Sequence, residues 1–190
     1  EAGDRYRVVT CHFNLVERLH MLRGFVRTLE DFYLDPEKIE KTLDLILEFK
    51  LEQFDELHRR FGDRVDGLFL TDDWGTQEGT FISSQLFPHF IDTGMDVLNM
   101  QQPQAYGIRE LGQQFAGKVC FLTTADIQAT LPSGDAEKVR AEVQELVEHW
   151  STPEGGFIVF NYGDPESLAV KPEMTEIMFH AFAEQMNRWQ

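Results

Sequence analysis

The chain has 190 residues, and 42% of them are hydrophobic, with 16 phenylalanines, so one domain over residues 1–190 can bury a substantial core. Its formal net charge of −16 argues against nucleic acid and anionic membranes as partners, because phosphate contacts need clustered lysine and arginine. No apolar run approaches the roughly 18 residues of a membrane span, and the start EAGDRYR lacks the basic and apolar regions of a signal peptide.

The two cysteines, Cys11 and Cys120, each lie inside an apolar run of strand length. We therefore expect two buried thiols rather than a disulfide. Free thiols suit a reducing compartment, so the expected location is the cytoplasm.

Apolar runs alternate with amphipathic helical patterns along the chain. The first helical pattern with clear ends follows Asp35, which can cap it, and Pro36, which suits the first helical position; Gly62 is its expected end. A second helix is predicted over 136–150, and a last one after Pro172. Strands are predicted over 6–13, 67–73, 97–101 and 118–124 and from residue 157 onward.

Each helix shows one apolar stripe at helical spacing. In the first, the expected buried residues are Ile39, Leu43, Ile46, Phe54, Leu57 and Phe61. In the helix over 136–150 they are Val139, Val143, Leu146, Val147 and Trp150. The acidic residues of that helix are expected on its solvated face, namely Glu137, Glu142, Glu145 and Glu148.

Nearly continuous apolar strands separated by such helices indicate an α/β protein, with a parallel sheet buried on both faces. Each strand also ends in hydrogen-bonding or ionisable side chains. In a (β/α)8 barrel these ends meet at one mouth, which holds the active site in that fold. No glycine-rich phosphate-binding motif follows a strand, which disfavours a dinucleotide-binding fold.

Three aspartates at the strand ends are the candidate catalytic residues. Asp72 and Asp73 follow the strand over 67–73, and alternation along a strand allows at most one to point into the mouth. Asp126 follows the strand over 118–124 and is the second acid–base candidate. For all three, the alternative is that the carboxylate caps a loop or helix through backbone N–H groups.

Other polar and aromatic residues at the strand ends are candidate ligand-binding residues. The indole of Trp74 can stack on a flat ring, with a core or loop anchor as the alternative. Amide side chains can both donate and accept, which suits carboxylate or amide recognition, with satisfaction of loop hydrogen bonds as the alternative. The amides are Gln77, Asn99, Gln101, Gln102 and Gln128, and Tyr162 follows the last strand.

Several segments resemble the C-terminal half of the uroporphyrinogen decarboxylase superfamily. They are LRGFVRTLEDFYLDPEKIE, GLFLTDDWGTQEGTFIS, the run from VLNMQQPQAYGIRELG to LPSGDAEKV, and EGGFIVFNYGDPESLAVKPEM. The resemblance implies a (β/α)8 barrel, known as a TIM barrel, that is incompletely represented by about five strands. It further implies that one βα unit is missing between Phe87 and Pro88, because ISSQLF and PHFIDTGMDVLN resemble parts of the family that are not adjacent.

The resemblance implies a carboxy-lyase that removes CO2 from a carboxylated tetrapyrrole-like substrate without a cofactor or metal, as in porphyrin biosynthesis. In the decarboxylase branch a histidine ends the strand that reads IVFNYG here, so Tyr162 or Asp164 would have to replace it. Members of the family often dimerise, so a homodimer is one expected state.

Two alternatives remain open within the same superfamily. One is a methyltransferase that uses zinc and a corrinoid to pass a methyl group to a thiol; its zinc ligands resemble His-x-Cys plus a later cysteine, and no cysteine follows Cys120 here. Cys11 and His12 do not replace that motif, because adjacent strand residues point to opposite faces. The other alternative is a barrel that binds a tetrapyrrole or corrinoid without turnover.

Overall fold

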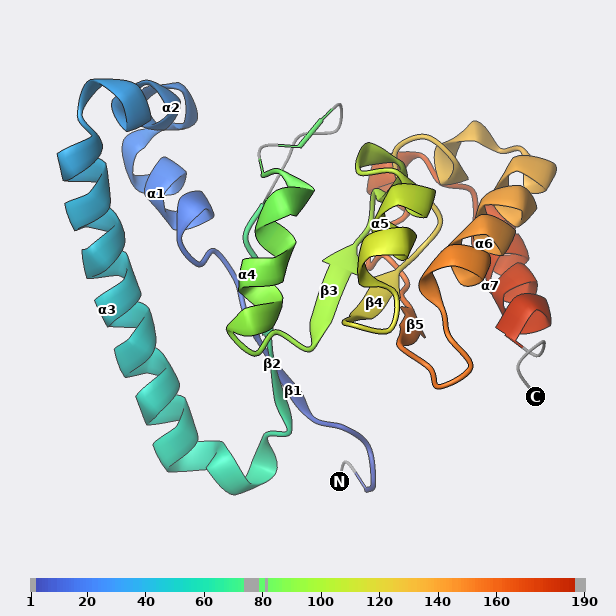
Figure 1. Ribbon diagram of the computed structural model, residues 1–190, viewed down its shortest axis with the longest axis horizontal. Helices are drawn as coiled ribbons and strands as arrows, with labels where there is room; N and C mark the ends of the chain where they lie inside the picture. Colours follow the sequence, from blue (N-terminus) through green and yellow to red (C-terminus); the bar gives the residue numbers. More distant parts are fainter. Residues whose placement is uncertain (1–2, 74–78, 81, 187–190) are drawn as a thin grey trace. The chain divides into compact units, whose positions relative to one another are not determined.

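The computed structural model describes residues 3–73, 79–80 and 82–186, which form a mixed α/β protein (Figure 1). The chain divides into two compact units, Glu1–Trp74 (unit 1) and Gly75–Gln190 (unit 2). Among the helices of the described residues, none combines the length and the apolar character that a bilayer crossing requires.

Unit 1 is built on two parallel strands, β1 (Val8–Cys11) and β2 (Gly67–Leu70), whose register pairs Cys11 with Leu70. Parallel neighbours need a long crossover connection. Here it consists of three helices, α1 (Val16–Arg23), α2 (Phe25–Leu34) and α3 (Pro36–Phe61), and a short 3₁₀ turn (Gly62–Arg64). Both strands therefore end at the same edge of this small sheet.

The long helix α3 starts at Pro36 and ends at Phe61, as predicted. The predicted cap by Asp35 is wrong, because its carboxylate makes no capping hydrogen bond and instead contacts the Lys38 ammonium one turn into the helix. The predicted stripe is buried only in part: Ile39 and Ile46 pack with Leu19 of α1. Phe61 is 41% exposed, because the buried cluster lies in the half of α3 that packs on α1.

Unit 2 contains three parallel strands that neighbour one another in chain order, β3 (Val97–Met100), β4 (Cys120–Thr123) and β5 (Phe157–Val159). Its helices are α4 (Phe87–Asp92), α5 (Ile108–Phe115), α6 (Ala136–Trp150) and α7 (Pro172–Met186). Short 3₁₀ turns precede them or follow the strands, at Ser84–Leu86, Pro103–Ala105, Leu131–Ser133 and Glu166–Leu168. Figure 1 shows α5, α6 and α7 arranged beside these strands.

The core of unit 2 forms where α5 and α6 pack on the sheet. The rings of Phe121 and Trp150 stack with their centroids 4.4 Å apart, and the Trp150 indole N–H donates to the Ile108 carbonyl at 2.7 Å. Helix α5 approaches α6 so closely at Gly112 that an added Cβ would lie 2.4 Å from the His149 carbonyl oxygen. Only glycine therefore fits at this position without a shift of the two helices.

The α6 stripe is buried at all five predicted positions, so that prediction is confirmed. The prediction that Glu142 faces solvent is wrong, since this residue is only 5% exposed. Position 142 is three residues after Val139 and four before Leu146, which places it on the buried stripe. The helical spacing therefore indicates that Glu142 is buried.

The strands of unit 2 are packed on one face more than on the other. In β4, Phe121 and Thr123 have no exposed surface, whereas the alternating residues Cys120 and Leu122 are half-buried. The expected burial on both faces is therefore not found in this strand, because the helices cover the face that carries Phe121. Cys11 and Cys120 are both free thiols and half-buried.

Phe87 and Pro88, between which a βα unit is predicted to be missing, are the first two residues of α4. The Phe87 side chain is fully buried and lies against the rings of Tyr106 and Phe115, with centroids 5.2 and 5.7 Å away. The missing unit stays a prediction.

Candidate functional site

In unit 1 the polar residues that follow β1 and β2 lie next to each other. The register that pairs Cys11 with Leu70 places His12 and Asn14 beside Thr71. The His12 ring nitrogen Nδ1 is 3.2 Å from the Thr71 hydroxyl, and the Asn14 amide donates to the Thr71 carbonyl at 2.7 Å. These contacts hold the two strand ends together.

Phe13, between His12 and Asn14, has a positive φ of 56°. This conformation is unfavourable for a bulky side chain and persists only where its surroundings fix it. The buried Lys50 of α3 donates to the His12 carbonyl at 3.1 Å, and the Arg18 guanidinium lies 5.7 Å from the centre of the Phe13 ring. Strained residues concentrate at functional sites, which draws attention to this strand end.

The Asp72 carboxylate binds the start of α1. It accepts backbone N–H hydrogen bonds from Leu15 at 3.1 Å, Val16 at 2.9 Å and Glu17 at 2.7 Å. A carboxylate at this place satisfies unpaired N–H groups and interacts favourably with the helix dipole. This is the capping arrangement considered above as the alternative to catalysis. Asp73, the next residue, is exposed.

The first turn of α1 also carries Glu17, which the sequence reasoning missed. Its side chain is buried, at 8% exposure, and its Oε2 atom has no hydrogen-bond partner among the described residues. Burial raises the pKa of this carboxyl group, and the nearby Asp73 and Asp72 raise it further. No local pattern marked Glu17, because its burial depends on the end of β2, more than fifty residues away in the chain.

In unit 2 the strand ends also share one edge, because Met100 pairs with Thr123 and Thr123 pairs with Val159. Gln101 and Gln102 follow β3, Asp126 follows β4, and Tyr162 follows β5, so this edge gathers four of the predicted residues. Both glutamines and Tyr162 are half-buried.

Asn99 lies within β3, opposite Leu122 in the register. Its Oδ1 atom is buried and has no hydrogen-bond partner among the described residues. A buried acceptor without a partner is costly, so it is a candidate contact for a ligand donor.

The Asp126 carboxylate is directed to its own loop. It is 3% exposed and accepts backbone N–H hydrogen bonds from Gln128 at 2.9 Å and Ala129 at 2.8 Å. As with Asp72, this is the capping arrangement. Gln128 is half-buried beside it.

Glu142 of α6 connects the loops that follow β3 and β4. Its carboxylate accepts hydrogen bonds from the Asp126 backbone N–H at 2.6 Å, the Thr130 hydroxyl at 2.7 Å and the Gln104 amide at 2.7 Å. Burial raises the pKa of Glu142, and the three hydrogen bonds oppose that shift. Glu142 thus positions the loop that carries Asp126.

Trp74 and Gln77 lie outside the described residues, so their predicted roles stay predictions. The remaining predicted residues form two groups. In unit 1, Asp72 and Asp73 lie beside Glu17. In unit 2, Asn99 lies within β3, and the residues that follow the strands at one sheet edge are Gln101, Gln102, Asp126, Gln128 and Tyr162.

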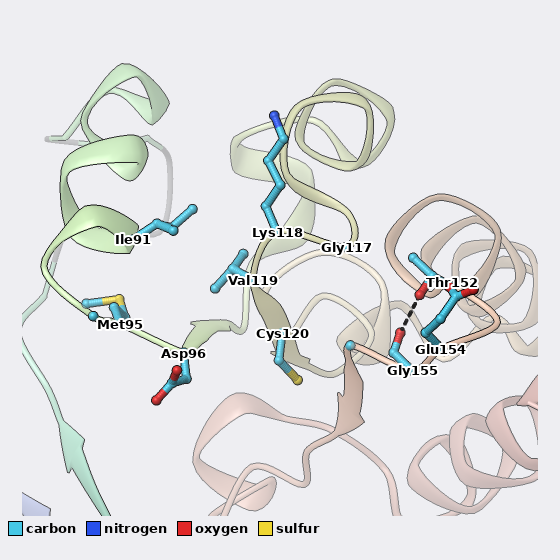
Figure 2. A pocket seen from close by; sticks show the side chains of 12 residues that line it. Ile91, Met95, Asp96, Gly117, Lys118, Val119, Cys120, Thr152, Glu154 and Gly155 are labelled. Carbon is cyan, nitrogen blue, oxygen red and sulfur yellow. Dashed lines mark hydrogen bonds between the residues drawn. The ribbon is translucent and has the colours of Figure 1, made fainter.

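A cavity of about 350 Å³ in unit 2 lies at the opposite, amino ends of the strands (Figure 2). It is lined by Asp96 before β3, Cys120 at the start of β4, and Gly156 before β5. Lys118 and Glu154 border it as well. The predicted site lies at the carboxyl ends of the strands, so this cavity is not the predicted site.

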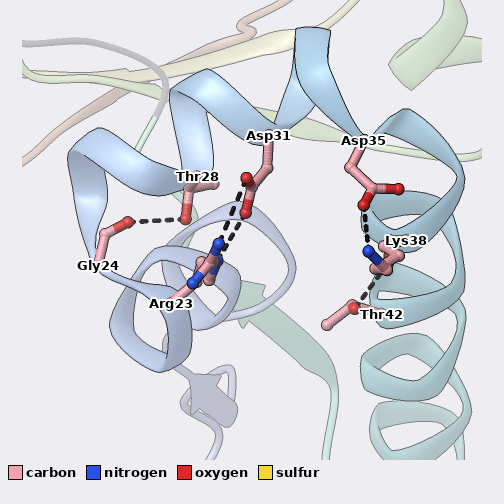
Figure 3. Close-up of polar contacts among 7 residues, drawn as sticks. All are labelled: Arg23, Gly24, Thr28, Asp31, Asp35, Lys38 and Thr42. Carbon is pink, nitrogen blue, oxygen red and sulfur yellow. Dashed lines mark hydrogen bonds and ion pairs between the residues drawn. The ribbon is translucent and has the colours of Figure 1, made fainter.

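A cavity of about 290 Å³ in unit 1 lies among α1, α2 and α3, with Leu19 and Ile39 in its wall. The charged side chains at its rim form ion pairs. The Arg23 guanidinium donates to Asp31 at 2.6 Å, and Lys38 contacts Asp35 (Figure 3). The Arg23 hydrogen bond lowers the pKa of Asp31. With both carboxylates occupied in this way, the rim offers no unpaired acid for chemistry.

Among the residues that the structure describes, no three histidine, cysteine, aspartate or glutamate side chains are placed to hold one metal ion. Comparison of the chain with protein-family models, with curated proteins and with solved structures finds no match.

Proposed function

We propose that the chain is part of a (β/α)8-barrel enzyme of the uroporphyrinogen decarboxylase type. It would remove CO2, without a cofactor, from a carboxylated tetrapyrrole-like substrate at the carboxyl ends of its strands. The observation that carries the proposal is the acidic group at the ends of β1 and β2, where Asp72 and Asp73 lie beside the buried Glu17.

The strand arrangement supports the barrel. Within each unit the strands are parallel and neighbour one another in chain order, which is compatible with a barrel. Apolar strand residues also remain uncovered: Leu68 is 47% and Leu70 is 50% exposed. An incomplete barrel leaves such side chains without neighbouring strands.

The acidic group supports the chemistry. Loss of CO2 from a pyrrole acetate requires a protonated ring, so a cation develops as the reaction proceeds. A carboxylate placed near that cation stabilises it, and more strongly where water is excluded. Asp73 is the exposed member of the pair and is assigned this role, while Asp72 keeps α1 in place through its three hydrogen bonds.

The test is anaerobic incubation of the 190-residue protein with uroporphyrinogen, followed by oxidation and chromatography, which separates porphyrins by their number of carboxylates. We expect products with fewer carboxylates, and a large loss of rate in Asp73→Asn. Asp44→Asn, an exposed aspartate on α3, is the matched control and should retain full activity. Unaltered uroporphyrinogen in the wild-type reaction would contradict the proposal.

The same preparation distinguishes the two alternatives. Stoichiometric zinc together with loss of the methyl group from methylcobalamin in the presence of a thiol would indicate a methyltransferase. A shifted porphyrin absorbance without any product would indicate a barrel that only binds its ligand.

A further inference from the structure

We infer that Glu17 is the proton donor of this site, delivering a proton to the ligand bound at the carboxyl ends of β1 and β2. The inference rests on the proposed function, since it names the acid of that reaction. It concerns a residue that neither the motifs nor the resemblance identified.

The geometry around Glu17 is the first support. The side chain is buried at 8% exposure, yet Oε2 has no hydrogen-bond partner among the described residues. A buried carboxyl oxygen without a partner is costly, and its persistence calls for a role. A ligand group at this place would supply the missing contact.

The backbone of Glu17 is held by the Asp72 carboxylate. Its N–H donates to Asp72 at 2.7 Å, and the two preceding residues donate to the same carboxylate. The position of the first turn of α1 is thus set by the end of β2. A fixed backbone limits the positions that the Glu17 carboxyl group can take, and general acid catalysis requires such positioning.

The charges around Glu17 favour its protonated form. Burial raises the pKa of Glu17, and Asp73 and Asp72 at the end of β2 raise it further. Two histidines oppose the shift, His12 from the end of β1 and His20 from α1 itself. From α3, the Lys50 ammonium is directed to the His12 carbonyl.

The proposed step balances in atoms and electrons. The O–H bond of Glu17 breaks as a C–H bond forms on a pyrrole carbon next to the one that bears the acetate, which leaves a carboxylate and a ring cation. The bond to the carboxylate carbon then breaks, its electron pair forms an exocyclic double bond that neutralises the ring, and CO2 leaves. A solvent proton converts the exocyclic carbon to methyl, and the ring returns its proton to Glu17.

Infrared difference spectroscopy tests whether Glu17 holds the proton, independently of any substrate. Spectra of the free protein across the pH range above the ordinary glutamate pKa should contain the band of a protonated carboxyl group. Glu142, whose pKa is also raised, contributes to this band, so its intensity should fall in Glu17→Gln and stay unchanged in Glu48→Gln, a matched change at an exposed position of α3. Absence of a band that depends on Glu17 would overturn the inference.

Turnover of uroporphyrinogen tests whether the proton is used. In Glu17→Gln we expect kcat to fall by about 100-fold or more with little change in KM, as for loss of a general acid. The wild-type rate should fall as pH rises through the raised pKa of Glu17, and the rate of Glu17→Gln should not show this decline. Glu17→Asp, which keeps a carboxyl group, should restore part of the rate and serves as the test variant if Glu17→Gln does not fold.

The outcomes separate the inference from the proposed function. Wild-type turnover with an equally active Glu17→Gln would overturn the role of Glu17 and leave the decarboxylase proposal intact. A wild-type protein that does not consume uroporphyrinogen would overturn the decarboxylase proposal, and with it the role of Glu17 as its acid. Loss of both the Glu17-dependent part of the band and the rate in Glu17→Gln supports the inference.

Discussion

The Asp72 carboxylate accepts a hydrogen bond from the Glu17 backbone N–H at 2.7 Å, so the end of β2 holds the start of α1 across 55 residues of sequence. The same carboxylate accepts the N–H groups of Leu15 and Val16. This single side chain therefore links the end of β2 to the helix that carries the buried acid.

Replacement of Asp72 by alanine should destabilise the protein. The change leaves three N–H groups at the start of α1 without their acceptor, and loss of a helix cap costs about 0.5–2 kcal/mol. Urea unfolding of Asp72→Ala measures the loss, with Asp44→Ala on the exposed side of α3 as the control. Equal stability of the two variants would show that the hydrogen bonds to Asp72 contribute nothing.

Replacement of Glu142 by glutamine should loosen the loop that follows β4. The amide keeps one acceptor oxygen where the carboxylate serves three donors, so at least one buried donor loses its partner, at a cost of about 1–3 kcal/mol. Hydrogen exchange at the Gln128 and Ala129 amides reports the change directly. Glu148→Gln, at an exposed position of the same helix, should leave this exchange unaltered.

Glu142 should also make stability depend on pH. Its pKa in the folded state is raised above the ordinary 4.5, so the folded state binds more protons than the unfolded state between the two values. The stability that this proton contributes is complete below pH 4.5 and is lost as pH rises through the raised pKa. The unfolding free energy, measured across this pH range, should decline less with rising pH in Glu142→Gln than in the wild type. An unchanged decline would contradict a raised pKa of Glu142.

Asp66 should titrate at unusually low pH. Hydrogen bonds from the Arg7 side chain and backbone lower its pKa from 3.8 to about 2. The stabilising effect of the ion pair between Arg7 and Asp66 is thus present above pH 3.8 and is lost as pH falls toward about 2. NMR titration of the carboxyl carbon checks the midpoint, which should move toward 3.8 in Arg7→Gln and stay low in Arg5→Gln.

Gly112 should not tolerate a side chain. An added Cβ would lie 2.4 Å from the His149 carbonyl oxygen, which forces α5 and α6 apart. Overpacking of this kind costs about 1–3 kcal/mol. Thermal unfolding should show a lower Tm for Gly112→Ala and no comparable change for Gly163→Ala, where a Cβ meets no atom within 4 Å.

Local sequence patterns were sufficient for the five strands and for α3, α6 and α7, whereas the short helices α4 and α5 were not predicted. Helix α6 spans the predicted residues 136–150, and the five strands lie within or at the predicted runs. Apolar periodicity and capping residues act over a few neighbours, so they can be read from adjacent positions. The polar residues at the carboxyl ends of parallel strands follow from the same reading, since strand direction fixes which end they occupy.

The tertiary structure alone decided what each acid does. Asp72 and Asp126 were predicted as catalytic groups with capping as the alternative, and their carboxylates bind backbone N–H groups. Glu17 was not predicted at all, and its burial beside Asp72 and Asp73 depends on the distant end of β2. The partner and the solvent exposure of a carboxylate are set by residues far away in the chain, so composition and spacing cannot determine its pKa or its role.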